Sequence, residues 1–210
     1  MEAGLANRDQ LAKPVVPRGA GLVLYPSAVM IAGGGDYSEL CQIGVDTAIY
    51  NLGQYSEWSG EPPYVTWQSG YSENGFASAL STAALFYYCG HGGPNRVGHT
   101  GTSVYTTDQL LGLGCPHLLL AVWYNCNGAQ QVEGDTNWLD ASRSAGADCA
   151  IAWEGEPWLH LAADWARAFY TDLSLTMDAD SACYDASWYA WQVNPMPYGI
   201  LTYQVAGNVT

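Results

Sequence analysis

The amino-acid sequence predicts a three-layer α/β/α sandwich built around a mainly parallel sheet of about six strands. Solid apolar runs such as Leu118–Tyr124 show no alternation with polar residues, which is typical of parallel strands covered on both faces. These runs alternate along the chain with helical patterns, and that alternation indicates an open α/β sheet. The 210 residues, 49% of them apolar, suffice for one domain with a substantial core.

The first half of the chain begins with a polar segment that contains Pro14 and Pro17. We interpret residues 1–20 as a tail or extended lead-in, and 21–210 as the domain. Apolar residues between Leu40 and Tyr50 recur at helical spacing and predict a helix there. The predicted elements are, in order, strands at Leu22–Leu24 and Ala28–Ala32, a helix over 37–53, a strand at Tyr64–Trp67, one or two helical turns at 73–81, and a buried strand at Ala83–Tyr88.

The second half continues the alternation. Asp108 suits the first turn of a helix, Gly146 suits a helix end, and Pro157 suits the first turn of another helix. The predicted elements are a helix at Thr107–Leu113, a buried strand at Leu118–Tyr124, a helix at Asp135–Ala145, a strand at Cys149–Trp153, an amphipathic helix at Pro157–Leu173, a helix over 179–192 and a last strand at Gly199–Ala206.

The charge balance narrows the class of partner. Six Lys and Arg stand against twenty Asp and Glu, which gives a net charge of −14. Nucleic acids and anionic membranes need clustered bases, so we expect neither as a partner. The balance weakly favours basic or neutral substrates.

The six cysteines are too sparse for a disulfide scaffold, and most lie in apolar segments typical of buried thiols. The N-terminal residues MEAGLANRDQ lack the pattern of a signal peptide, and the longest apolar run is too short to span a bilayer. We therefore expect a soluble chain; its compartment and oligomeric state stay open.

Two apolar runs stop abruptly at a reactive side chain beside glycine. ALFYYCG leads into His91-Gly92-Gly93, and LLLAVWYN leads into Cys126-Asn127-Gly128. In open α/β sheets the functional crevice lies beyond the carboxyl ends of the strands. If the two strands are parallel neighbours, His91 and Cys126 emerge side by side at one edge of the sheet.

This pair suits acyl transfer. A cysteine with an ordinary pKa is mostly protonated at neutral pH, and a neighbouring imidazole can take its proton and later donate one to a departing amine. The N–H groups of Gly92 and Cys126 are candidates for an oxyanion hole, in which each donor stabilises the transition state by roughly 2.7–4 kcal/mol.

The order of these motifs resembles the caspase, gingipain, clostripain and legumain clan of cysteine peptidases, to which CHAT domains are related. The likeness continues through IAGGGDY, ASRSAGADCAIAWEGEPW and LAADWARAFYTDL, and spans residues 21–206. It implies a cysteine endopeptidase (a thiol protease) with a Cys126–His91 dyad, a thioester acyl-enzyme, a peptide or protein substrate lying extended against a strand edge, and no cofactor. Calcium dependence stays open.

The resemblance also implies a specificity pocket beside the strand that ends at Trp153 and Glu154. Several members of the clan carry an acidic residue there, so Glu154 is a candidate partner for a substrate Arg or Lys, with Glu156 as an alternative. The alternative, that Glu154 is simply a solvated residue at the end of the strand, is nearly as well supported as a role in substrate binding. Arg18-Gly19 in the lead-in suggests a site for self-processing.

Other interpretations remain. Cys126 can be a buried structural thiol, and His91 a loop residue. His99, His117 and His160 lack a matching context for a catalytic base. Cys89-x-His91 and Cys115-x-His117 form a formal zinc set, although their places in the strands separate them. A non-catalytic caspase-like module that binds a protein partner is the alternative from another functional class.

Overall fold

The structure is a computed structural model that describes residues 28–32, 38–52, 65–68, 73–99, 102–116, 118–176, 178–193 and 203–207. The predicted lead-in, the predicted strand at Leu22–Leu24, the Arg18-Gly19 site and His117 lie outside the described residues. Within them, no helix is long and apolar enough to cross a bilayer.

A six-stranded sheet forms the centre of the molecule, in the order β2-β1-β3-β6-β7-β8. Every neighbouring pair is parallel except β7 and β8, which are antiparallel. The strands are β1 (Ala28–Ala32), β2 (Val65–Gln68), β3 (Leu85–Cys89), β6 (Leu120–Tyr124), β7 (Cys149–Trp153) and β8 (Tyr203–Gly207).

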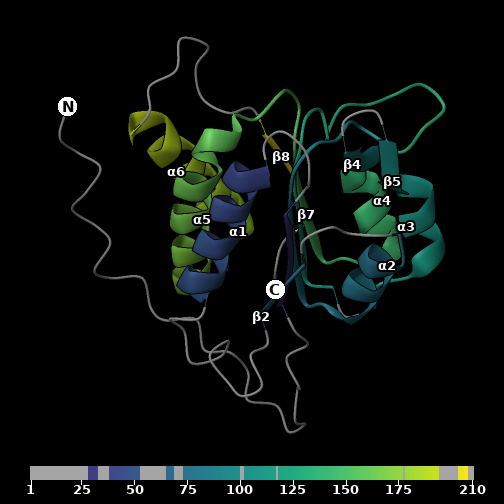
Figure 1. The fold of residues 1–210 in the computed structure, drawn as a ribbon, viewed down its shortest axis with the longest axis horizontal. Helices are drawn as coiled ribbons and strands as arrows, with labels where there is room; N and C mark the ends of the chain where they lie inside the picture. The colour runs from purple at the N-terminus through teal and green to yellow at the C-terminus, as the bar shows by residue number, and fades with distance from the viewer. Residues whose placement is uncertain are drawn as a thin grey trace, which may run out of the picture.

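Helices cover both faces of this sheet, so the predicted three-layer architecture with a mainly parallel sheet is confirmed. One face carries three helices that pack side by side, with α5 in contact with both α1 and α6. Figure 1 shows α2, α3 and α4 on the other face. The helices are α1 (Ser38–Leu52), α2 (Glu73–Thr82), α3 (Thr107–Leu113), α4 (Trp138–Ala145), α5 (Ala162–Thr176) and α6 (Ala179–Val193).

The sheet separates two apolar clusters. Every residue of β3, β6 and β7 is buried, as solid apolar strands predict. Because side chains alternate between faces, Tyr87 and Cys89 join the cluster under α1 and α5, whereas Phe86 and Tyr88 join the cluster under α2 and α4. Because all the side chains within these three strands are buried, the residues that can meet a ligand are those that follow the carboxyl ends of the strands.

Three features differ from the sequence prediction. A two-stranded antiparallel sheet, β4 (Arg96–His99) and β5 (Thr102–Thr106), was not predicted, since its strands are short and polar. Helix α4 begins at Trp138, because the Asn137 side chain caps it by accepting from the backbone N–H of Asp140 at 2.9 Å. The helix predicted from Pro157 starts as an extended segment and a short 3-10 helix, Leu159–Leu161, before α5.

Candidate functional site

Strands β3 and β6 are adjacent and parallel, and each ends beside a predicted reactive residue. Their register pairs Cys89 with Tyr124, and one further hydrogen bond, from the Gly90 N–H to the Tyr124 carbonyl at 3.1 Å, extends the ladder. His91 and Cys126 therefore follow at the same edge of the sheet. The predicted neighbourhood of the two strands is confirmed.

The histidine loop, residues 90–95, is held by the β4–β5 hairpin. The His91 carbonyl accepts from the Gly98 N–H at 3.2 Å and from the Tyr88 hydroxyl at 2.7 Å. The Gly93 N–H donates to the Arg96 carbonyl at 2.8 Å. These bonds fix the backbone from which the His91 imidazole projects.

The cysteine turn, residues 125–129, is bonded to the segment that follows β7. Asn127 has a φ of 56°, a left-handed conformation that asparagine tolerates better than most residues, and this reverses the chain directly after Cys126. The Asn127 N–H donates to the Gly155 carbonyl at 2.7 Å, and the Ala129 N–H donates to the Trp153 carbonyl at 2.9 Å. The segment after β7 therefore lies against Cys126.

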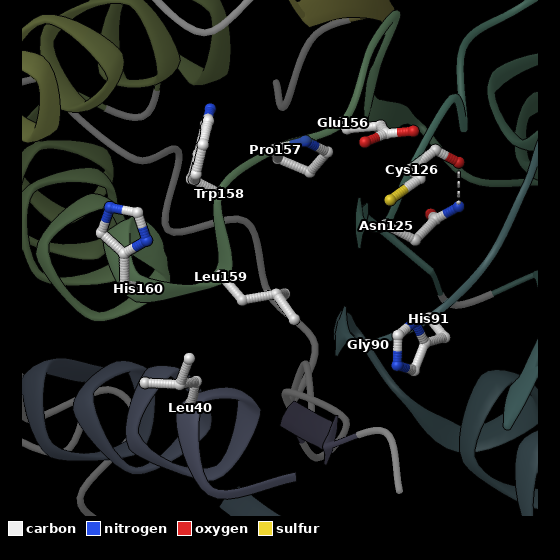
Figure 2. Close-up of a pocket in the computed structure, with 10 residues that line it drawn as sticks. All are labelled: Leu40, Gly90, His91, Asn125, Cys126, Glu156, Pro157, Trp158, Leu159 and His160. Carbon is white, nitrogen blue, oxygen red and sulfur yellow. Dashed lines mark hydrogen bonds between the residues drawn. The ribbon is translucent and has the colours of Figure 1, made fainter. Parts of the chain in front are cut away.

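A pocket of about 570 Å³ opens at this edge of the sheet. Figure 2 shows the His91 imidazole and the Cys126 sulfur on one side, and the 157–160 segment on the other. The Trp158 carbonyl accepts from the Tyr124 hydroxyl at 3.1 Å, which anchors that wall to β6. The lining residues are Leu40, Gly90, His91, Asn125, Cys126, Glu156, Pro157, Trp158, Leu159 and His160.

The electrostatics of the pocket keep Cys126 neutral at rest. Burial raises the pKa of the Cys126 thiol above its ordinary value, and the negative charge of Glu156 raises it further. A hydrogen bond from its own backbone opposes these effects only in part. At neutral pH the sulfur is therefore a thiol, so a base is needed for it to act as a nucleophile.

The predicted specificity residues lie elsewhere. Trp153 is 1% exposed, and its ring packs against the rings of Tyr124 and Trp165 at centroid distances of 4.5 and 5.0 Å. Its side chain does not join the pocket, in contrast to the expectation, because it continues the face of β7 that α5 covers. Glu154 is exposed, and its carboxylate accepts a hydrogen bond from Gln204. Glu156, the alternative, is the acidic residue that lines the pocket.

A second histidine lines the same pocket. His160 is exposed and its ring meets the Trp158 ring edge-on, with centroids 5.4 Å apart. Gly92 is not part of the lining and packs against Asn125 instead. The cysteines of the formal zinc set divide between the two core clusters, Cys89 on one face of the sheet and Cys115 on the other.

Sequence reasoning missed three parts of the site. Leu40 lies in α1, and it lines the pocket only because of the way that helix packs on the sheet. The sequence predicts a helix at 157–160, whereas the structure has an extended segment that leads into a short 3-10 helix. Asn125 is fully buried at the end of an otherwise apolar strand. A buried amide between an apolar run and a candidate nucleophile is the one signal that the sequence offered.

No family model matches the chain, and no curated protein matches it in sequence. Solved structures do match it. The Arg-specific cysteine proteinase gingipain R aligns with a TM-score of 0.63 at 13% identity, over 87% of this chain and 46% of the gingipain chain. Porphyromonas gingivalis RgpB, in the complex of its pro- and mature domains, aligns with a TM-score of 0.63 at 18% identity, over 87% of this chain and 47% of its own.

Separase of Saccharomyces cerevisiae, in its complex with securin, aligns with a TM-score of 0.58 at 12% identity, over 87% of this chain and 12% of its own. The chain thus spans about half the length of the gingipain chains and a small part of separase. At these identities the likeness is one of fold. The resemblance to the caspase–gingipain clan is confirmed at that level.

Proposed function

We propose that the chain is a cysteine endopeptidase in which Cys126 is the nucleophile and His91 is the acid and base. The observation that carries the proposal is that these two side chains line one pocket beyond the carboxyl ends of adjacent parallel strands. The fold shared with cysteine proteinases supports it. Fold alone does not determine chemistry, so the proposed activity rests on Cys126 and His91.

The neutral resting thiol defines the order of proton movements. His91 takes the Cys126 proton as the sulfur attacks the peptide carbonyl, which forms a tetrahedral intermediate with a negative oxygen. The intermediate collapses to a thioester when His91 gives that proton to the departing amine. A water molecule, deprotonated by His91, then attacks the thioester, and the proton returns to the sulfur as the acid product leaves.

Backbone donors are available for the negative oxygen. Within the described part of the chain, neither the Gly92 N–H nor the Cys126 N–H donates to a backbone carbonyl, although the Cys126 N–H is bonded to its own sulfur in the resting site. Both adjoin a member of the dyad, so we propose them as the oxyanion hole, as the sequence predicts. These two N–H groups would stabilise the negative oxygen of the transition state more than the neutral carbonyl of the substrate. That difference would accelerate the reaction.

Glu156 suggests which side chain the pocket accepts. It is the acidic residue among those that line the pocket, whereas the Glu154 carboxylate is bonded to Gln204. A carboxylate beside the apolar and aromatic wall at 157–160 suits the long stem and positive head of Arg or Lys. We propose a basic residue before the cleaved bond, which also agrees with the net charge of −14.

A set of fluorogenic peptides that differ only in the residue before the cleaved bond tests the proposal. We expect turnover with Arg or Lys, little with Ala or Asp, and none after Cys126→Ala. His160→Ala is the matched control for His91→Ala, since both histidines line the pocket. We expect His91→Ala to lower kcat by roughly 10²–10⁴-fold and His160→Ala to retain most of it.

Equal losses in the two histidine variants would refute the assignment of His91. No turnover on any peptide, with the protein folded, would favour the non-catalytic module that binds a protein partner. Peptide display selection would then identify the bound sequence.

A further inference from the structure

The side chain of Asn125 connects the histidine loop to the cysteine turn. It is 0% exposed, and its Nδ2 donates to the Gly93 carbonyl at 3.2 Å and to the Cys126 carbonyl at 3.1 Å. Figure 2 shows this amide beside Cys126, on the side of the pocket that carries His91. One side chain thus bonds both segments that bear the proposed dyad.

Few other bonds link these two segments. The β3–β6 ladder ends at the bond between the Gly90 N–H and the Tyr124 carbonyl. Beyond it, within the described residues, no backbone hydrogen bond joins the histidine loop to the cysteine turn. The Gly93 carbonyl has a second donor, the Trp138 indole N–H at 2.9 Å, and the Trp138 backbone N–H donates to the Gly128 carbonyl at 3.1 Å, so α4 forms a second, indirect link between the two segments. The direct side-chain link is therefore Asn125.

Two glycines leave the space that the amide occupies. A Cβ on Gly92 would lie 2.7 Å from Asn125 Nδ2, and a Cβ on Gly128 would lie 2.9 Å from Asn125 Oδ1. Neither glycine has a positive φ, so conformational freedom does not explain them. At both glycines the Asn125 amide is instead the nearest obstacle to a side chain, followed by the Arg96 carbonyl at 3.0 Å for Gly92 and the Ala152 Cβ at 3.3 Å for Gly128.

The amide orientation follows from its neighbours. Rotating it by half a turn would direct Oδ1 at the carbonyls of Gly93 and Cys126, which are themselves acceptors. In the observed orientation Oδ1 is buried without a hydrogen-bond partner among the described residues. A buried acceptor without a partner destabilises a fold, so stability alone does not account for asparagine at this position.

We propose that Asn125 is a positioning residue, which bridges the histidine loop and the cysteine turn and thereby sets the approach of the His91 imidazole to the Cys126 sulfur. This inference rests on the proposed function of the same site. Asn125 is among the residues that line the pocket, but its side chain is 0% exposed, so in this proposal it acts on the dyad and not on the substrate. Its effect is transmitted through the backbone of Gly93 and Cys126.

Asn125→Asp is the sharpest variant, because it keeps the shape of the side chain and removes the two N–H donors. The matched control is Asn137→Asp, which is also a buried asparagine (1% exposed) with an Nδ2 bonded to a carbonyl, that of Ala129 at 3.0 Å. Among the described residues, the Asn137 side chain hydrogen-bonds to the cysteine turn and to the start of α4. It therefore tests the introduction of a carboxylate without loss of the bridge.

For Asn125→Asp we expect kcat to fall about 100-fold, the cost of misplacing reacting groups by about 1 Å, while KM changes little. The rate of Cys126 alkylation by iodoacetamide, measured against pH, should shift toward the profile of His91→Ala. Asn137→Asp should keep the wild-type profile. Wild-type kcat and an unshifted alkylation profile in Asn125→Asp would overturn the inference.

A second pair of variants covers a failure of Asn125→Asp to fold. Gly128→Ala should lower the melting temperature, because its Cβ meets the Asn125 amide. Adding Asn125→Ala should restore much of that loss, since the obstructing amide is gone. If kcat stays low in this stable double variant, the bridge positions the dyad; if kcat returns with stability, Asn125 only fills space and the inference is wrong.

The alkylation profiles also separate this inference from the proposed function. Identical profiles for wild type and His91→Ala would mean that no dyad exists, and both proposals would fall. Different profiles for those two proteins, with Asn125→Asp following wild type, would overturn the bridge alone.

Discussion

Trp138→Phe tests whether the position of the histidine loop depends on its packing from α4. Trp138 is fully buried, its ring lies 3.9 Å from that of Trp123, and its indole N–H donates to the Gly93 carbonyl at 2.9 Å. Phenylalanine keeps an aromatic ring and loses the donor. The Gly93 carbonyl keeps one partner, the Asn125 amide.

The cost follows from two losses. The hydrogen bond contributes about 0.5–1.5 kcal/mol. The smaller ring buries about 40–50 Å² less surface, or about 1 kcal/mol at 25 cal/mol per Å². We therefore expect the free energy of unfolding to fall by about 2 kcal/mol, and by somewhat more if the space left is not refilled. Urea denaturation with an unchanged m-value measures this change.

The matched control is Trp165→Phe. Trp165 is equally buried, and its indole N–H donates to the Ser187 hydroxyl at 3.2 Å, on the opposite face of the sheet from α4. We expect a similar loss of stability from the same two causes. Only Trp138→Phe should lower kcat/KM, on the order of tenfold, because only its donor holds the loop that carries His91.

Both variants are assayed at a temperature where each is fully folded. Equal activity losses in the two would refute the reasoning, since they would trace the loss to general instability. Substitutions at the surface usually change the free energy of unfolding by less than about 0.5 kcal/mol. A loss that small in Trp138→Phe would contradict the burial of Trp138.

Three further predictions concern charge and hydrogen bonding. Glu156→Gln removes a negative charge that raises the Cys126 pKa, so the alkylation rate of Cys126 should rise at lower pH, and the preference for Arg-ended peptides should weaken; an unmoved profile would contradict this. Burial raises the pKa of Cys149 from 9.0 to about 12, so between those values the unfolded thiol loses its proton and the native one keeps it. The free energy of unfolding should then fall with rising pH by up to about 1.4 kcal/mol per pH unit, and Cys149→Ala should reduce that slope in alkaline urea titrations; the same slope in both proteins would count against it. Tyr124→Phe removes the donor to the Trp158 carbonyl and should raise KM more than it lowers kcat, with a stability loss of about 1 kcal/mol; steady-state kinetics in which only kcat falls would be the contrary result.

The sheet was predictable because its central strands are solid apolar runs. β7 matches its predicted bounds at both ends, and β3 and β6 were placed to within two residues at each end. Their parallel pairing then brought the histidine and cysteine motifs to one edge. The β4–β5 hairpin has no such run, and its strands are held by pairing and by packing of a few residues such as Val97 and Tyr105.

The pocket beyond those strands was less predictable. The position of Trp153 and Glu154 at the end of β7 predicts a place in the pocket, but the alternation of side chains decides what each one contacts. Trp153 shares its face with Cys149 and Ile151, so its ring lies under α5. Glu156 reaches the pocket because of the path that the chain takes after β7; Gly155 and Pro157 indicate a turn there, but no local pattern indicates its direction.

The cysteine turn and the opposite wall are held by different parts of the fold. Hydrogen bonds to both flanks of the turn come from the segment that ends β7, whereas the wall at 157–160 is tied back chiefly through its own short helix and one tyrosine hydroxyl. A randomised library confined to Leu159 and His160 would therefore vary the wall of the pocket that faces the proposed dyad and leave the backbone around Cys126 in place. This division offers a route to redirecting selectivity without rebuilding the reactive centre.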